Sequence, residues 1–302
     1  MSTGVGTSSC CLSGVINSGT PKGRTEEIGG LQTYVAEPEK GSKAVVIFIA
    51  DSNAASLPCI CAYSNDYTVF GWTLPNTRLL ADSYAKAGFR AYIPDFHDGD
   101  SIHPDFLQTV EPTLPEREKL TVVQKATSTA SIGATLGPWL TKHREAVARP
   151  LIEDFINAAR YIPGTDKVGV IGFCWGGRYA ALAANQPFSG TQEGKGVDAA
   201  YACHPSLVSI PADFTDVAVP LSLALGTKDS LLGEYEAGQL KELLEKKKTG
   251  ADGILKTDTE CVLYEDQVHG FALRGDFSSE KDKKAMDAAE KQGIEWFKKY
   301  LT

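Results

Sequence analysis

The sequence predicts an α/β fold, in which helices cover both faces of a mostly parallel, doubly wound sheet. Short β-rich runs alternate with longer stretches of helical periodicity along its 302 residues. Residues 44–50 and 167–172 are apolar without alternation, as parallel strands covered on both faces are. The hydrophobic content of 42% and charged content of 23% are those of a globular protein. We expect one domain over residues 1–302.

Seven runs are expected to form the strands. They are residues 31–36, 44–50, 90–95, 167–172, 198–204, 220–226 and 260–266. Apolar residues that share a helical face predict two helices. The first helix is expected to have Pro150 in its first turn. Its apolar face carries Leu151, Ile152, Phe155, Ile156 and Ala159. The second, at the C-terminus, carries Met286, Ala289, Gly293, Phe297 and Tyr300.

Two segments interrupt this alternation. Residues 101–142 are polar, rich in Pro, Thr and Ser, and contain no clear strand. Long loops in compact domains tend to be functional, so this segment is interpreted as a lid-like excursion that faces the substrate. The alternative is a solvated insertion. Residues 52–68 form an atypical insertion after a core strand.

Composition excludes several classes of function. A net charge of −8 argues against nucleic-acid binding. No run approaches the roughly 18 apolar residues of a membrane span, and no signal peptide is evident. The 7 cysteines are irregularly spaced, which favours a reduced, cytoplasmic protein. The pairs Cys10/Cys11 and Cys59/Cys61 lack a second pair at zinc spacing, so no metal or cofactor is expected.

The run 167–172 ends in Gly172-Phe173-Cys174-Trp175-Gly176 and leads into an Ala-rich helical pattern. A Gly-x-nucleophile-x-Gly sequence between a strand and a helix is typical of a nucleophile elbow, whose sharp turn leaves no room for larger side chains at the glycines. Cys174 is the predicted nucleophile, and the Trp175 amide one oxyanion donor. The alternative is a small buried cysteine in a tight turn.

The acid and the histidine of a triad are expected downstream, in that order. Asp229 lies just beyond the apolar run 220–226, and His269 follows the run 260–266. His97, His103 and His143 are interpreted as surface residues. His204 ends a strand at the same edge of the sheet, where it is predicted to line the substrate pocket; a structural, hydrogen-bonded histidine is the alternative.

Together, "GFCWGG", "GTKDSLL" and "HGFALRGD" resemble the dienelactone hydrolase family of α/β-hydrolases. The stretches "CCLSG", "GTPKG", "TYVAEP" and "LPNTRLLADSYAKAGFRAYIPDFHDGD" are similar to its eukaryotic, fungal-type branch. The resemblance covers nearly the whole chain. It implies a metal-free esterase with a Cys174-His269-Asp229 triad that cleaves carboxylic esters or enol-lactones through a thioester.

The resemblance also implies substrate contacts. Arg274 is similar to the basic residue that meets a substrate carboxylate, although it lies one position later than in the bacterial pattern. Asp51 matches an acid near the thiol, and Val69 matches the second oxyanion amide. The expected partner is a small ester or lactone, and the chain is expected to be a monomer or a homodimer.

The segment 52–68 departs from the family pattern, because it separates Asp51 from "VFGW" at 69–72. If it loops out, Asp51 and the Val69 amide still reach Cys174; if not, the oxyanion hole is broken. We hypothesise that the segment is a translated, unspliced intron, and a genuine surface insertion is the alternative. Sequencing the transcript distinguishes the two.

Two other functions are compatible with parts of the sequence. A cysteine amidotransferase also uses an elbow cysteine, but it usually pairs the nucleophile with a histidine followed closely by Glu, which "HGFALRG" lacks. A pseudo-hydrolase that acts as a binding scaffold is supported by the insertion at 52–68.

Overall fold

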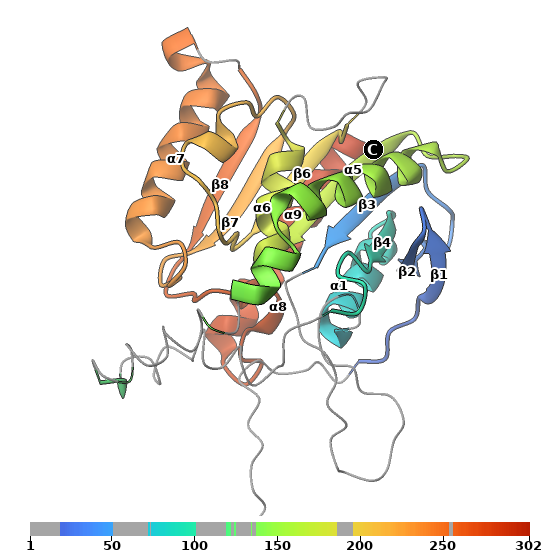
Figure 1. The fold of residues 1–302 in the computed structure, drawn as a ribbon, viewed down its shortest axis with the longest axis horizontal. Helices are drawn as coiled ribbons and strands as arrows, with labels where there is room; N and C mark the ends of the chain where they lie inside the picture. The colour runs from blue at the N-terminus through green and yellow to red at the C-terminus, as the bar shows by residue number, and fades with distance from the viewer. Residues whose placement is uncertain are drawn as a thin grey trace, which may run out of the picture.

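An eight-stranded sheet forms the centre of the molecule in the computed structural model (Figure 1). The structure describes residues 19–50, 72, 74–100, 119–121, 124, 134, 137–185, 196–253 and 256–302. The strands are β1 (Arg24–Ile28), β2 (Leu31–Ala36), β3 (Ala44–Ile49), β4 (Arg90–Pro94), β5 (Lys167–Phe173), β6 (Ala199–Cys203), β7 (Leu221–Gly226) and β8 (Thr259–Tyr264). Their spatial order is β1-β2-β4-β3-β5-β6-β7-β8.

Only β2 runs against the other strands of this sheet, because it pairs antiparallel with both β1 and β4. All the other neighbouring pairs, from β4-β3 to β7-β8, are parallel. Parallel neighbours need crossover connections, which the helices supply. The predicted mostly parallel sheet of an α/β-hydrolase is therefore confirmed.

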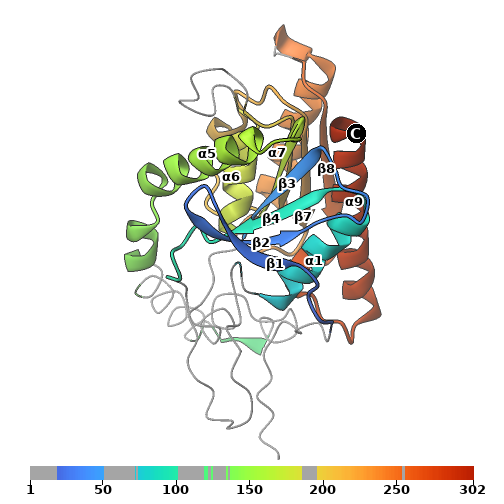
Figure 2. The same ribbon diagram turned by 90° about the vertical axis from the view of Figure 1, so that its right-hand side faces the viewer.

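The helices lie on both faces of the sheet (Figure 2). They are α1 (Pro75–Lys86), α5 (Glu145–Tyr161), α6 (Trp175–Ala183), α7 (Glu234–Thr249), α8 (Phe271–Arg274) and α9 (Glu280–Leu301). Buried residues of α5, α6 and α7 share one hydrophobic core with the sheet, and those of α1, α8 and α9 share another. The predicted cover on both faces is confirmed.

Strand β3 shows why its sequence is apolar without alternation. Val45 and Ile47 point into the core under α5 and α6, while Val46 and Phe48 point into the core under α1 and α9. Successive side chains of a strand point to opposite faces, so both sets must be apolar when both faces are covered. All six residues of β3 are buried.

All seven predicted strands form close to their expected limits, and β1, which the sequence analysis did not identify, pairs with β2 across the turn at Gly29-Gly30. The position of Pro150 was predicted wrongly. The helix α5 begins at Glu145 rather than at Pro150, which lies inside it. The predicted apolar face does pack, since Ile152, Phe155 and Ile156 are buried.

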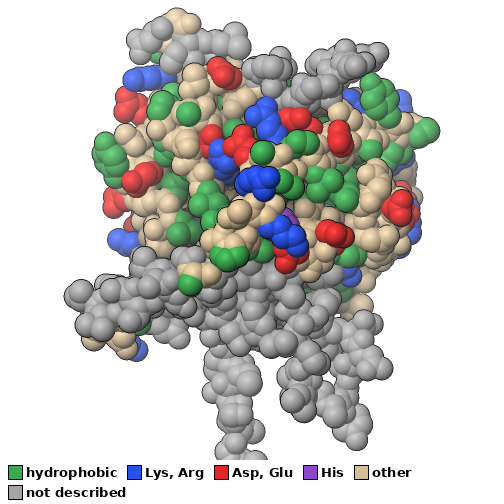
Figure 3. Space-filling view, viewed as in Figure 1, with side chains coloured by type: hydrophobic (Ala, Val, Ile, Leu, Met, Phe, Trp, Pro, Cys, Tyr) green, Lys and Arg blue, Asp and Glu red, His purple; other side chains and the backbone are tan. Residues whose placement is uncertain are grey.

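Acidic and basic side chains alternate with hydrophobic ones over the described part of the face shown in Figure 3. Within the described ranges, none of the helices combines the length and the apolar composition that crossing a bilayer requires.

Residues 51–71 are not described, so the predicted insertion at 52–68 lies outside the described residues, as does most of the excursion at 101–142.

The junction of β5 and α6 depends on two glycines. A Cβ on Gly172 would lie 2.0 Å from the carbonyl oxygen of Gly176, and one on Gly176 would lie 2.1 Å from that of Ile49. Both contacts are with backbone, which has no room to move. The first turn of α6 therefore packs directly on β3 and β5.

We expect Gly172→Ala to cost about 3 kcal/mol or more of the free energy of unfolding, because the backbone contact forces the junction apart. The control is Gly238→Ala in α7, where a Cβ meets nothing within 4 Å. Because this position is exposed and helical, Gly238→Ala should raise the free energy of unfolding by about 0.5–1 kcal/mol. Urea unfolding of both variants measures the difference, and equal stabilities would contradict the close contact.

Candidate active site

Cys174 occupies the turn between β5 and α6 and has a left-handed backbone, with φ 53° and ψ −116°. A positive φ in a residue other than glycine is strained, and such strain is characteristic of a nucleophile elbow. The side chain is 8% exposed, at the carboxyl end of a central strand. The predicted strand–turn–helix context of Cys174 is therefore present.

Asp229 and His269 form a buried pair at the same edge of the sheet. Asp229 follows β7, His269 follows β8, and His269 Nδ1 lies 2.8 Å from Asp229 Oδ2. The other carboxylate oxygen, Oδ1, accepts hydrogen bonds from the backbone N–H groups of Leu231 (2.8 Å) and Leu232 (3.2 Å). The carboxylate is thus held from one side while it orients the imidazole on the other.

The loops that carry this pair are joined to each other. The N–H of Lys228 donates to the carbonyl of Gln267 over 2.9 Å, and the N–H of Asp266 donates to the hydroxyl of Thr227 over 2.8 Å. A Cβ on Gly226 would lie 2.2 Å from the Gln267 carbonyl oxygen. This close approach brings Asp229 and His269 together although 39 positions intervene.

Cys174 and Asp229 both act on the protonation of the His269 ring. Burial lowers the pKa of His269, but the charges of Asp229 and Cys174 and hydrogen bonds to both raise it well above its ordinary value. Nε2, the nitrogen not bonded to Asp229, is buried and has no partner of regular hydrogen-bond geometry among the described residues. Since Nδ1 is bonded to Asp229, Nε2 is the ring nitrogen left for a further proton transfer.

His204 lies against the same imidazole. Its ring centroid is 5.1 Å from that of His269 and 5.8 Å from that of Phe271, and the side chain has no exposed surface. Burial, then the charges of His269 and Arg274, lowers the pKa of His204 well below its usual range, so the ring is neutral. The His204 ring contacts His269 and Phe271 rather than solvent, and its predicted substrate contact stays a prediction.

Arg274 ends the short helix α8, which begins two residues after His269. Its guanidinium lies over the backbone of Gly270, where a Cβ would be 2.5 Å from Nη2. The side chain is partly exposed, and its charge acts on His204. Arg274 therefore lies close to the His269–Asp229 pair, and its predicted contact with a substrate carboxylate stays a prediction.

Trp175 begins α6, so its N–H has no partner within the helix and is available beside Cys174. Its ring packs on His97, with centroids 4.7 Å apart, and on Tyr179 at 4.4 Å. Trp139, from the end of the predicted excursion, lies 5.9 Å from Trp175 and 4.5 Å from His143.

The interpretation of His97 and His143 as surface residues is wrong, because they are only 5% and 7% exposed. Both are covered by Trp139, and His143 Nε2 lies 2.8 Å from Asp100 Oδ2. The pairs His97–Trp139 and His143–Asp100 join residues more than 40 positions apart, so no spacing in the sequence predicts this packing. His103 lies outside the described residues.

Asp51 and Val69 lie outside the described residues, so their predicted roles beside the thiol and in the oxyanion hole remain predictions. The sequence analysis missed Ser206, whose hydroxyl lies 3.5 Å from Cys174 Sγ. No spacing rule links a serine after β6 to an elbow after β5. Within the described part of the chain, no group of three or more His, Cys, Asp or Glu residues is arranged to hold a metal ion.

The arrangement of an elbow cysteine, an imidazole and a carboxylate at one edge of a parallel sheet defines an α/β-hydrolase-type enzyme. The model of the dienelactone hydrolase family matches residues 66–301. The chain therefore belongs to the dienelactone hydrolase family, whose members are hydrolases of esters and lactones.

Individual relatives agree with this assignment. The chain is 22% identical to hydrolase pyvD of Aspergillus violaceofuscus, over 97% of each chain. It is 25% identical to the carboxymethylenebutenolidase homolog of Xenopus tropicalis, over 93% of this chain and 92% of the relative. A solved dienelactone hydrolase of Anabaena variabilis has the same fold, with a TM-score of 0.54 and 17% identity over 93% of this chain and 98% of that one.

The buried His97 predicts a pH dependence of stability. Burial, and then the charge of His143, lowers the pKa of His97 from 6.5 to about 3, against the opposing effect of Asp100. Between these values only the unfolded chain binds the proton, so the free energy of unfolding falls as the pH drops below 6.5.

Between pH 7 and pH 5, the free energy of unfolding of His97→Phe should fall by about 2 kcal/mol less than that of the native protein. His204 and the other titrating groups are present in both proteins, so the difference isolates His97. Denaturant unfolding at the two pH values measures it. Identical pH slopes in the two proteins would contradict a neutral, buried His97.

Proposed function

We propose that Cys174 is the nucleophile of this ester and lactone hydrolase and that the reaction passes through a thioester on its sulfur. The observation that supports the proposal most is the buried pair in which Asp229 Oδ2 lies 2.8 Å from His269 Nδ1, while the charge of Cys174 raises the pKa of the same imidazole. A carboxylate on Nδ1 leaves Nε2 to exchange a proton with the sulfur.

The reaction has two halves. The Cys174 thiolate attacks the carbonyl carbon and forms an S–C bond, and the negative oxygen is stabilised by backbone amides, of which Trp175 offers one. The C–O bond then breaks, and the leaving enolate or alkoxide takes the proton that His269 carries. His269 next removes a proton from water, which attacks the thioester and releases the acid and the thiolate.

The raised pKa of His269 suits this cycle, since a protonated imidazole stabilises a neighbouring thiolate. A thiolate attacks most effectively where the leaving group departs easily. Enol-lactones and activated esters have such leaving groups, because an enolate is stabilised by delocalisation. We therefore propose small enol-lactones as the substrate class.

Arg274 supports a narrower proposal, that the substrate carries a carboxylate. A guanidinium binds a carboxylate through two parallel hydrogen bonds, and this one lies beside Gly270, next to the catalytic imidazole. The scaffold alternative has less support, because a protein without activity has no need of a strained cysteine facing a His–Asp pair. We further propose a cytoplasmic enzyme with a small-molecule partner.

Cys174→Ala should abolish the burst of p-nitrophenol that an activated ester releases, because no acyl-enzyme forms without the sulfur. The residual rate should be at least about 10³-fold lower than that of the native enzyme. Stopped-flow absorbance measures both quantities. Full activity in Cys174→Ala would exclude the thioester, and hydrolysis of glutamine instead of esters would favour the amidotransferase alternative.

Arg274→Met should raise the KM for lactones that carry a carboxylate by about 10-fold or more, because a charge-assisted bidentate pair is lost. The KM for neutral p-nitrophenyl acetate should change little, which serves as the internal control. Arg274→Lys keeps the charge without the bidentate geometry. Its KM for the carboxylate-bearing lactones should lie between those of the native enzyme and Arg274→Met. A uniform loss on charged and neutral substrates would assign Arg274 to structure.

A further inference from the structure

The turn that follows β6 reaches the reacting sulfur. Ser206 is buried, its hydroxyl oxygen lies 3.5 Å from Cys174 Sγ, and its N–H donates to the carbonyl of Cys174 over 3.0 Å. We propose that Ser206 is a further catalytic residue, whose hydroxyl donates a hydrogen bond to the Cys174 thiolate. The inference deepens the proposed function and rests on it, because it assigns a role at the same sulfur.

The direction of the hydrogen bond follows from the charge on sulfur. A neutral thiol can donate to the hydroxyl oxygen or accept from it. A thiolate carries no proton and can only accept, so the Ser206 hydroxyl must donate once Cys174 is ionised. Hydrogen bonds to ionised acceptors are stronger than those to neutral ones, and the bond therefore favours the thiolate over the thiol.

The turn is fitted closely to the elbow. A Cβ on Gly177 would lie 2.9 Å from the Cα of Pro205, so the first turn of α6 and the 204–206 turn approach more closely than an alanine would allow. The N–H of His204 donates to the carbonyl of Ala224 over 2.8 Å, which holds the start of the turn against β7. The second glycine after Cys174 is explained by this approach.

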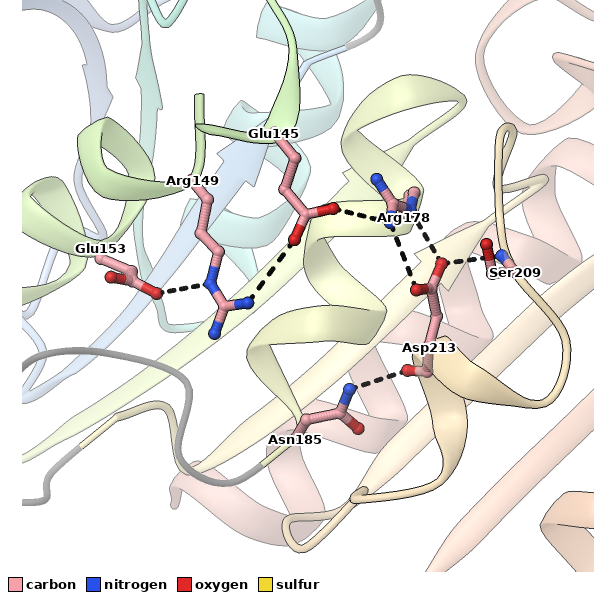
Figure 4. A network of polar contacts seen from close by, with 7 residues as sticks. All are labelled: Glu145, Arg149, Glu153, Arg178, Asn185, Ser209 and Asp213. Carbon is pink, nitrogen blue, oxygen red and sulfur yellow. Dashed lines mark hydrogen bonds and ion pairs between the residues drawn. The ribbon is translucent and has the colours of Figure 1, made fainter. Parts of the chain in front are cut away.

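A carboxylate clamp holds the other end of the same segment (Figure 4). Asp213, in the 3₁₀ helix η2 (Ala212–Phe214), accepts two hydrogen bonds from the Arg178 guanidinium, at 2.8 and 3.2 Å. Its Oδ2 also accepts from the N–H of Ser209 over 2.8 Å, and Asn185 donates to its carbonyl over 2.8 Å. Arg178 lies in α6, the helix that starts directly after Cys174. The clamp therefore joins the segment 204–213 to the elbow.

The hydrogen bond has different strengths along the reaction. It is strongest to the free thiolate and weak to the sulfur of a thioester, which carries little charge. It therefore stabilises the thiolate as the group that leaves when water attacks the acyl-enzyme. Without it, we expect deacylation to slow relative to acylation and the acyl-enzyme to accumulate.

The experiment follows alkylation of Cys174 by iodoacetamide as a function of pH, without any substrate. Only a thiolate reacts, so the pH midpoint of the alkylation rate reports the ionisation of Cys174. Tryptic cleavage after Lys167 and Arg178 releases residues 168–178, in which Cys174 is the single cysteine. Mass spectrometry of this peptide separates Cys174 from the other thiols.

Four proteins are compared. Ser206→Ala removes the donor and should move the midpoint up by about 1 pH unit. Ser206→Thr keeps a hydroxyl and should restore most of the shift. The matched control is Ser222→Ala. Ser222 is a buried serine of β7 whose hydroxyl lies 2.7 Å from Glu260 Oε2, and the midpoint of this variant should equal that of the native protein.

The titratable and charged groups around Cys174 and His269 are the same in all four proteins. Among the described residues they include Asp229, His204, Cys203 and Arg274, and Asp51 is likewise unchanged. A shift confined to Ser206→Ala therefore belongs to the hydroxyl. If Ser206→Ala does not fold, Ser206→Gly removes the same donor without adding a titratable group and gives the same comparison on the same peptide.

An unchanged midpoint in Ser206→Ala, or an equal shift in Ser222→Ala, would overturn the proposal. Its failure is distinguishable from failure of the proposed function. Full ester hydrolysis by Cys174→Ala would remove the nucleophile role and leave the alkylation comparison meaningful. An inactive Cys174→Ala together with an unmoved Ser206→Ala midpoint would remove the role of Ser206 alone.

Discussion

The close contact between the Gly176 backbone and the end of β3 is the constraint on which the site depends. With no Cβ at Gly172 or Gly176, the first turn of α6 lies directly on the central strands. The chain can then reverse within one residue, and that residue, Cys174, is left with a positive φ. Its sulfur is thereby raised above the carboxyl edge of the sheet, beside the start of a helix whose N-terminus favours negative charge.

The parallel sheet then supplies the remaining groups by one rule. Strands β5, β6, β7 and β8 all end at the same edge, so each following loop delivers a side chain to one place: Cys174, Ser206, Asp229 and His269. The loops are fixed to one another by backbone hydrogen bonds, as between Lys228 and Gln267. These four side chains are therefore preorganised by the described loops that carry them.

Electrostatics divides the buried imidazoles into different roles. His269 has a carboxylate on one nitrogen, which outweighs the cost of burial and favours the charged ring. His204, in contact with it, and His97, behind Trp175, have no carboxylate directly paired with them and stay neutral. One residue type thus provides a proton carrier and two packing groups, according to whether a counter-charge accompanies burial.

The sequence by itself determined the sheet, because strands buried on both faces must be continuously apolar, and it predicted the elbow at Cys174, because a sharp turn demands glycines at fixed positions around it. It placed Asp229 and His269 through their position after apolar runs. Only the tertiary structure decided that Ser206 meets the sulfur, that His97 and His143 are buried under Trp139, and that Arg178 holds Asp213. Apart from that of Trp139 with His143, these contacts join segments far apart in the chain, and such packing leaves no periodicity or spacing from which it can be predicted.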